Sequence, residues 1–316
     1  MNARPLTFAA QQRGVILLIL SMLILMTGAS VFINVMNNNL VEQRNSLDTA
    51  RVLNDAKDTL ISYAILHSDY YGAAGAGPGH LPCPDTNGDG VENTPCAFNA
   101  LGRLPRSVVL PSTSVLPIST ANDATDQQLW YALSNAFRRL PAGALNTTTA
   151  GTLTLDGQAG IAAVLIAPGE ILGSQTRRNN TNSNYLEAGN AGGQNFVSND
   201  AADPDNFNDR VLAISITEIL SPVTARVAEA IKLELDNYHA VDGAYPDDTS
   251  FDDPLLVDYA TALAAAPAWL ANNGWIANST YTKLSADTAT VAFTGCGITY
   301  SLAESALSVT RTGAQC

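Results

Sequence analysis

The chain has 316 residues, of which 46% are hydrophobic and 14% are charged. Disordered chains have low hydrophobicity, so this composition indicates a folded protein. The formal net charge is −13. Because nucleic-acid phosphates bind basic patches, this acidic balance argues against a nucleic-acid partner, and it suits an exported protein or one that holds cations.

The first distinctive segment in chain order is apolar. Residues 14–41 include no charged side chain, and the strongly apolar part covers 15–36. As a helix this part would be about 33 Å long, enough to cross a hydrocarbon core of about 30 Å. We therefore predict a transmembrane helix over 15–36. A cleaved secretion signal is the alternative, because the small residues at 27–30 could serve as a cleavage site.

The charges before this segment predict an orientation. Arg4 and Arg13 precede it, and no acidic residue does. Positively charged flanks stay on the cytoplasmic side of a membrane. The short N-terminus is therefore expected in the cytoplasm, and everything after Asn37 is expected across the membrane.

A helical pattern continues beyond the apolar segment. Apolar residues recur every three or four positions as far as Ala64, with charged residues between them. This spacing predicts an amphipathic continuation of the same helix. The helix is expected to end before "GAAGAGPGH", which begins at Gly72, because a glycine-rich stretch with a proline breaks helices.

Two stretches of the chain share a sequence frame. "ARVLNDAKDTLISY" begins at Ala50 and "ARVAEAIKLELDNY" at Ala225, and both fit ARV-x4-K-x2-L-x2-Y. Each is followed by a glycine and then by Pro and Asp. Duplication predicts two similar modules, 37–220 and 221–316, with a boundary near Ser221-Pro222. Chance similarity between two amphipathic helices is the alternative.

Short runs bounded by Gly, Asp or Pro are typical of strands. They occur at 152–157, 160–169 and 209–220, and 289–316 alternates as antiparallel strands do. Residues 173–208, rich in Asn, Gly, Ser and Asp, are expected to form a long surface loop. The predicted fold class is α+β: a long N-terminal transmembrane-plus-amphipathic helix packed on a small antiparallel sheet, with a second helix-plus-sheet module.

All four cysteines lie beyond the apolar segment. They form two pairs that are local in sequence, each flanked by Gly or Pro. Four cysteines allow three pairings, of which we favour the local one, Cys83–Cys96 and Cys296–Cys316. CxxC metal spacing does not occur, and disulfides are typical of exported proteins.

These features together resemble the type IV pilin and type II secretion pseudopilin superfamily. Its members have a short basic leader ending in glycine, a long apolar helix with an amphipathic second half, and a small sheet. The leader is similar to residues 1–14 here. "LPCPD", "GRLP" and "LWYALS" over 81–134 resemble the globular part of many pilin-like proteins, and Tyr245-Pro246 resembles the major pseudopilin. The Cys296–Cys316 pair is similar to the C-terminal disulfide loop of pilins.

The resemblance implies processing and partners. A prepilin peptidase would cut between Gly14 and Val15 and methylate the new N-terminus. Family members usually carry Glu at the fifth mature position, where this chain has Ile19, and its absence implies a minor subunit, at the tip or in priming. The implied partners are other pilin or pseudopilin subunits, the peptidase and the bacterial inner membrane. The C-terminal bulk would be periplasmic or in a fibre.

A polar loop offers a candidate metal site. "DTNGDGVEN" places oxygen-bearing side chains at alternate positions before a glycine turn, as calcium loops do. The predicted calcium ligands are Asp85, Asn87, Asp89 and Glu92, inside the loop that Cys83–Cys96 would close. A metal-free turn rich in Asp and Asn is the alternative. A weaker second candidate is the run of Asp247, Asp248, Asp252 and Asp253.

Catalytic motifs are missing from the sequence. The three histidines, His67, His80 and His239, have no metal-site spacing, and His67 and His239 are expected to be exposed or capping. No GxSxG, P-loop or GxGxxG motif occurs. We therefore predict a structural protein and not an enzyme: a minor pilin or pseudopilin that assembles by packing of its apolar helix. The alternatives are a single-pass anchored binding protein or adhesin outside any fibre and, with least support, a membrane-tethered hydrolase.

Overall fold

A computed structural model describes residues 11–72, 76–140, 143–173, 175–199, 203, 206–247, 259–263, 266–313 and 316. The side chains at 11–17, 28–35, 37–39, 260 and 261 also lie outside the description. The chain divides into two compact units, Met1–Thr49 and Ala50–Cys316.

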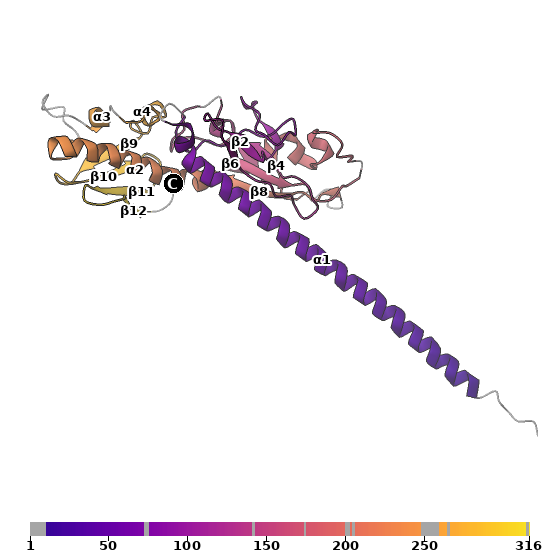
Figure 1. The fold of residues 1–316 in the computed structure, drawn as a ribbon. Coiled ribbons are helices and arrows are strands. Elements are labelled where there is room, and N and C mark those ends of the chain that lie inside the picture. Colours follow the sequence, from indigo (N-terminus) through magenta and orange to yellow (C-terminus); the bar gives the residue numbers. More distant parts are fainter. Residues whose placement is uncertain are drawn as a thin grey trace, which may run out of the picture. The chain divides into compact units, whose positions relative to one another are not determined.

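One long helix, α1 (Gln11–Tyr71), contributes to both units (Figure 1). It has 61 residues, so the predicted single helix is confirmed. It ends where the sequence predicts, because Gly72 takes a left-handed φ of +71° and donates its N–H to the Ser68 carbonyl at 2.9 Å. Glycine accepts this conformation without steric cost, which makes it the usual residue after a helix.

The predicted membrane span is not supported. In the part of the chain that the structure describes, no helix is both long and apolar enough to cross a membrane. This finding contradicts the transmembrane helix predicted at 15–36 and the predicted single-pass location in the bacterial inner membrane. Within 15–36 the described side chains are those at 18–27 and 36. A helix of ten residues is about 15 Å long, about half of a hydrocarbon core.

In the second unit, α1 is amphipathic. Leu53, Ala56, Leu60 and Ala64 are buried in the main core, at the three- and four-residue spacing that places them on one face. Lys57 lies beside this face and donates to the Ala213 carbonyl at 2.9 Å. The end of α1 is therefore fixed to the sheet both by apolar packing and by a hydrogen bond.

Six strands form the larger sheet, in the order β1-β4-β6-β5-β7 with β8 beside β6. Their bounds are Leu101–Arg103 (β1), Trp130–Leu133 (β4), Leu153–Leu155 (β5), Gln158–Ala167 (β6), Asn195–Phe196 (β7) and Arg210–Ser215 (β8). Most neighbours are antiparallel, but β5 and β7 are parallel. The sheet is curled into a half-barrel. The predicted fold class is therefore wrong: the chain is mixed α/β, and its first sheet is neither small nor purely antiparallel.

The two faces of this sheet pack against different partners. Side chains alternate between faces along a strand, so Tyr131 and Leu165 join the main core with the helices. Trp130 and Ile166 face a second, smaller core. That core is closed by Tyr185, Leu186 and Phe196, from the stretch predicted to be a long surface loop.

The expectation of a surface loop at 173–208 is thus wrong in part. Its described residues include two short 3-10 helices, η2 (Asn182–Asn184) and η3 (Ala188–Gly192), in addition to β7. Its apolar residues Tyr185, Leu186 and Phe196 cover the outer face of the sheet. Because the stretch 173–208 is low in hydrophobic residues, its composition does not indicate that it covers the sheet.

Helix α2 (Ile216–Asp242) follows β8 directly. A capping box starts it: Ser215 Oγ accepts from the Glu218 N–H, and the Glu218 carboxylate accepts from the Ser215 N–H at 2.9 Å. The strand predicted over 209–220 is therefore correct only as far as Ser215. The predicted boundary at Ser221-Pro222 falls inside α2, and the residues of both predicted modules share the main core.

The second sheet has four antiparallel strands in the order β12-β11-β10-β9. Their bounds are Ser279–Lys283 (β9), Thr288–Phe293 (β10), Ile298–Ala303 (β11) and Thr310–Gly313 (β12). This confirms the antiparallel C-terminus predicted from its alternation. The buried hydroxyls of Thr224 on α2 and Tyr300 on β11 lie 2.8 Å apart and tie helix to sheet.

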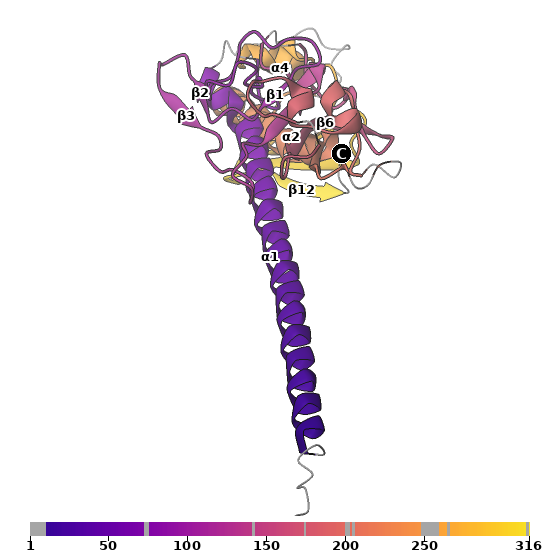
Figure 2. The ribbon, with the colours of Figure 1, turned by 90° about the vertical axis from the view of Figure 1, so that its right-hand side faces the viewer.

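Smaller elements complete the second unit. A hairpin of β2 (Ser107–Val109) and β3 (Val115–Pro117) forms a two-stranded sheet of its own (Figure 2). The 3-10 helix η1 (Asn135–Phe137) follows β4, and α3 (Tyr259–Ala262) and α4 (Ala268–Asn272) precede β9. The segment that follows η1 includes Arg139.

Candidate functional site: an apolar helix segment and a disulfide-closed loop

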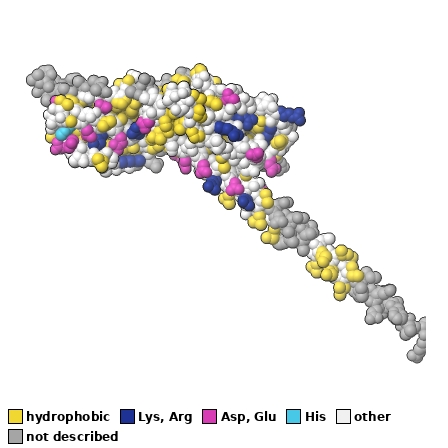
Figure 3. Space-filling view, viewed as in Figure 1, with side chains coloured by type: hydrophobic (Ala, Val, Ile, Leu, Met, Phe, Trp, Pro, Cys, Tyr) yellow, Lys and Arg dark blue, Asp and Glu magenta, His cyan; other side chains and the backbone are white. Residues whose placement is uncertain are grey.

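In the first unit, α1 exposes a continuous apolar surface. Eight of the nine side chains from Leu18 to Met26 are large and hydrophobic, and each is 53–73% exposed. Nine residues make about two and a half helical turns, so this surface surrounds the helix. Figure 3 shows these hydrophobic side chains on the described part of the helix.

The hydroxyls of Ser21 and Thr27, on the described part of this helix, are bonded within it. Ser21 Oγ donates to the Leu18 carbonyl at 2.9 Å, and Thr27 Oγ1 lies 2.9 Å from the Leu23 carbonyl. A hydroxyl that is satisfied inside its own helix can enter an apolar contact without losing a hydrogen bond to water. The segment is therefore chemically suited to packing against another apolar surface.

The residues predicted to be processed lie at the start of α1. The helix begins at Gln11, so the backbone of Gly14 and Val15 is helical. The side chain of Val15, and all of residues 1–10, lie outside the described residues. Cleavage between Gly14 and Val15 stays a prediction. Ile19, the fifth residue from Val15, is 53% exposed and belongs to the apolar segment.

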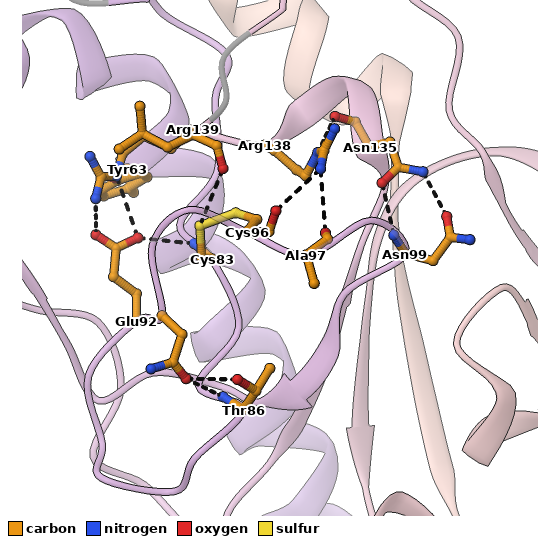
Figure 4. The surroundings of a disulfide bond; sticks show 12 residues. Tyr63, Cys83, Thr86, Glu92, Cys96, Ala97, Asn99, Asn135, Arg138 and Arg139 are labelled. Carbon is orange, nitrogen blue, oxygen red and sulfur yellow. Dashed lines mark hydrogen bonds and ion pairs between the residues drawn. A yellow bond between two sulfur atoms is a disulfide. The ribbon is translucent and has the colours of Figure 1, made fainter.

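The Cys83–Cys96 disulfide is present, as predicted. Both cysteines are buried, and the backbone N–H of Cys83 donates to Glu92 Oε2 at 3.0 Å inside the loop that they close. Figure 4 shows Glu92 pointing back toward the disulfide and toward Arg139. The loop is therefore folded around one of its own carboxylates.

The predicted calcium ligand Asp85 is buried and already hydrogen bonded. Its Oδ1 accepts the Gly88 N–H at 2.6 Å and its Oδ2 accepts the Gly90 N–H at 2.8 Å. Asn87 and Asp89 bond to each other at the exposed tip, with Asn87 Nδ2 donating to Asp89 Oδ2 at 3.0 Å. These contacts are those of a turn stabilised by Asp and Asn side chains.

Glu92, the fourth predicted ligand, pairs with a cation of the protein. Its Oε1 lies 2.5 Å from Arg139 Nη2, with the two side chains 3% and 11% exposed. Arg139 also lies 4.7 Å above the ring of Tyr71. Sequence reasoning missed Arg139, because nothing in the spacing of residues 92 and 139 shows that they meet.

Calcium binding stays a prediction. Among the described residues, no three His, Cys, Asp or Glu side chains lie close enough to hold a metal ion. The four predicted ligands are in one loop, but the carboxylates of Asp85 and Glu92 are used by backbone N–H groups and Arg139. In the weaker acidic run, Asp247 bonds to Lys283 at 2.9 Å, and Asp248, Asp252 and Asp253 lie outside the described residues.

The second predicted disulfide, Cys296–Cys316, is also present. Cys296 lies in the turn between β10 and β11, so the bond attaches the C-terminal residue to the four-stranded sheet. It closes a sequence separation of 20 residues. This confirms the pairing that the local spacing favours.

The histidines differ from expectation. His67 was expected to be exposed or capping, but it is 1% exposed, and burial lowers its pKa to about 3. His80 is fully buried, and burial lowers its pKa as well. His239 lies in the last turn of α2 and contacts Asp287 at 2.8 Å. Neutral, buried imidazoles are therefore part of the core around the end of α1.

The sequence also gives no sign of a second pair, formed by the carboxyl groups of Glu187 and Asp209. The Glu187 N–H donates to Asp209 Oδ2 at 2.9 Å, and the Asp209 N–H donates to Glu187 Oε2 at 3.0 Å. Burial, and secondly the charge of Glu187, raises the pKa of Asp209 to about 8. The pair joins the loop that covers the outer face of the large sheet to the start of β8.

Comparisons of the chain with protein-family models, with curated proteins and with solved structures find no match. The resemblance to pilins therefore depends on the sequence features alone.

Proposed function

We propose that this chain is a minor pilin- or pseudopilin-like structural subunit of a type IV pilus- or type II secretion-type fibre, and that it joins other subunits through the apolar segment of α1. The observation that carries the proposal is the exposure of eight large hydrophobic side chains within Leu18–Met26. Soluble proteins rarely expose a continuous apolar patch of this kind unless it meets a partner.

The energetics favour burial of this segment against other helices. Burying one Leu, Ile or Met side chain contributes about 1.5–3 kcal/mol, so eight contribute on the order of 10 kcal/mol before the costs of association. A segment that is apolar on all sides can pack with several neighbours at once, as a helix inside a fibre does.

Ile19 supports the assignment to a minor subunit. A shaft subunit of the superfamily would carry Glu at this position, where it pairs with the N-terminal amine of a neighbour. Here an exposed isoleucine can contribute only packing. A subunit that lacks this ion pair is better suited to a position in the fibre where it does not have to bind another subunit as the shaft subunits do.

Mass spectrometry of the mature protein from its own host tests the proposal. We expect a chain that begins at Val15 and carries one extra methyl group on its N-terminal amine. Gly14→Leu should block this cleavage, whereas Gly173→Ala, far away in the sequence, should not. An intact Met1 in the wild-type protein would overturn the proposal.

A further inference from the structure

Residues 182–197 form a cover on the outer face of the large sheet. Tyr185, Leu186 and Phe196 of this cover pack in the second core with Trp130 of β4. The cover contains η2, η3 and β7, and β7 pairs with β5 through two residues of each strand. A segment held by so small a core and so short a strand pair can open locally, so its polar contacts decide whether it stays closed.

Asp209, the residue before β8, binds the cover at two points. Its Oδ2 accepts the Glu187 N–H and the side-chain amide of Asn190, both at 2.9 Å. Asn190 is fully buried, and its own Oδ1 accepts the Val197 N–H at 2.9 Å. One carboxyl oxygen of Asp209 thus connects the start of η3 with the residue that follows β7.

The other carboxyl oxygen of Asp209 has no such partner. Asp209 is 3% exposed, and its Oδ1 is buried without a hydrogen bond to any of the described residues. An ionised carboxylate would leave this oxygen without a donor at a depth where water does not reach it, which is costly. A protonated carboxyl group carries its own donor. The geometry therefore favours a proton on Asp209.

Glu187 is the charged neighbour that makes this proton necessary. Its Oε2 accepts the N–H groups of Asn208 and Asp209 at 3.1 and 3.0 Å, and its Oε1 accepts from Gln175 Nε2 at 2.5 Å. These three donors stabilise the negative charge on Glu187. A hydrogen bond between the two side chains then favours the protonated form of Asp209. Burial, and secondly the charge of Glu187, raise the pKa of Asp209 to about 8.

Among the described residues, Glu187 is the charged group that acts on Asp209. Arg177 donates to the carbonyls of residues 168–170, and Arg103 lies over the Tyr185 ring. Arg210 follows Asp209 in the chain but is exposed. Other charged side chains on the surrounding elements bind elsewhere or are exposed: Arg51, Asp55 and Lys57 on α1, and Asp156, Glu170, Arg178 and Asp203.

A metal ion is a poorer occupant of this place than a proton. Calcium and magnesium need several oxygen ligands. The neighbours of the two carboxyl groups are instead N–H donors, from the backbone and from the amides of Asn190 and Gln175. These donors would repel a cation, whereas a proton needs no further ligand.

We propose that Glu187 and Asp209 form a proton latch: the cover is closed while they share one proton, and it opens locally when that proton is lost. The O–H bond of Asp209 is the covalent bond that breaks, and its proton goes to the solvent. The two carboxylates are then charged and adjacent, and they gain hydration only if the cover moves away from the sheet. Opening uncovers Trp130 and the other apolar residues of the outer face. The latch is independent of assembly through α1.

Hydrogen–deuterium exchange of the full chain, followed by mass spectrometry from pH 5 to 9 in EDTA, tests the latch. After correction for the intrinsic exchange rate at each pH, protection of the amides in 182–197 should fall about tenfold per pH unit between pH 5 and 8 and then level off. The amides of β6 exchange through global unfolding and should stay better protected at every pH. Equal protection of the cover and β6, or protection of the cover that does not change with pH, would overturn the proposal.

Three variants separate the latch from a merely structural role. Asp209→Asn imitates the protonated carboxyl group, because its amide can donate to Glu187, so protection of the cover should no longer depend on pH. Glu187→Gln removes the second charge, and the fall in protection should level off at a lower pH. Asp156→Asn changes an exposed carboxylate that accepts the Ser198 N–H at 2.8 Å, just after the cover, and should keep the wild-type pH dependence. Wild-type pH dependence in Asp209→Asn, or its loss in Asp156→Asn, would contradict the latch.

Discussion

The Oε1 atom of Glu92 lies 2.5 Å from Nη2 of Arg139, and the two side chains are 3% and 11% exposed. The pair joins the disulfide-closed loop to the segment that follows η1, and Glu92 also accepts the Cys83 N–H at 3.0 Å. A charge at this depth is tolerated only because the opposite charge meets it. The loop is thus stabilised by a buried ion pair in addition to its disulfide.

Removal of one member of this pair should be strongly destabilising. We expect Glu92→Gln to lower the free energy of unfolding by about 3 kcal/mol, because it leaves the Arg139 charge nearly buried without a counter-charge. Urea denaturation of both proteins measures the difference. Asp55→Asn, which breaks the exposed pair with Arg51, is the control and should cost less than about 0.5 kcal/mol. Equal effects of the two substitutions would contradict this account.

Asp85 should stabilise the loop without a metal. Asp85→Ala removes the acceptor of the Gly88 and Gly90 N–H groups, so we expect a loss of about 2 kcal/mol even with EDTA present. Thermal melting in EDTA measures this loss. The same melts in calcium chloride test the predicted ion: a calcium-dependent rise in the wild type that Asp89→Ala lacks would support it. No rise in the wild type would end the calcium prediction.

The buried carboxyl of Asp209 should make stability depend on pH. Its pKa is raised to about 8 in the folded protein, against an ordinary value near 4, so the folded state favours the protonated form. The contribution of Asp209 to the free energy of unfolding should therefore be largest below about pH 4. It should fall as the pH rises to about 8.

The Asp209→Asn variant isolates this dependence. Asparagine keeps an acceptor for the Glu187 N–H and carries no charge at any pH, so its advantage over the wild type should grow between pH 5 and 8 by at least about 1 kcal/mol. Denaturation at several pH values measures it. The exposed change Asp55→Asn should show no such growth, and a constant difference for Asp209→Asn across this range would refute the raised pKa.

Local sequence signals predicted local structure well. The end of α1 at Gly72 followed from the glycine-rich stretch, and the spacing of the cysteines indicated both disulfides. Alternation indicated the antiparallel C-terminal strands. In each case the deciding interaction lies within a short stretch of chain, or the residue type itself restricts the options.

Features made by distant residues could not be predicted in this way. Arg139 lies 47 positions from Glu92, and nothing in either neighbourhood marks the pair. The outer face of the large sheet is covered by a stretch whose composition suggested a surface loop, because few of its described residues, among them Tyr185, Leu186 and Phe196, pack in the second core. The start of α2 could have been predicted, because Ser215 and Glu218 have the capping-box spacing.

The central claim is that the apolar segment of α1 packs against other subunits, and a single substitution tests it. Ile24 is 63% exposed in the first unit, and Leu284 is 64% exposed in the second. An aspartate at position 24 would place a charge inside any helix-to-helix contact, whereas one at position 284 would leave that contact unchanged.

The amount of the chain in fibres sheared from its host is the most direct measurement. We predict that the wild-type protein and Leu284→Asp are present in the sheared-fibre fraction and that Ile24→Asp is lost from it at equal expression. Recovery of Ile24→Asp in fibres at the wild-type level, or absence of the wild-type protein from them, would contradict the proposed assembly through α1.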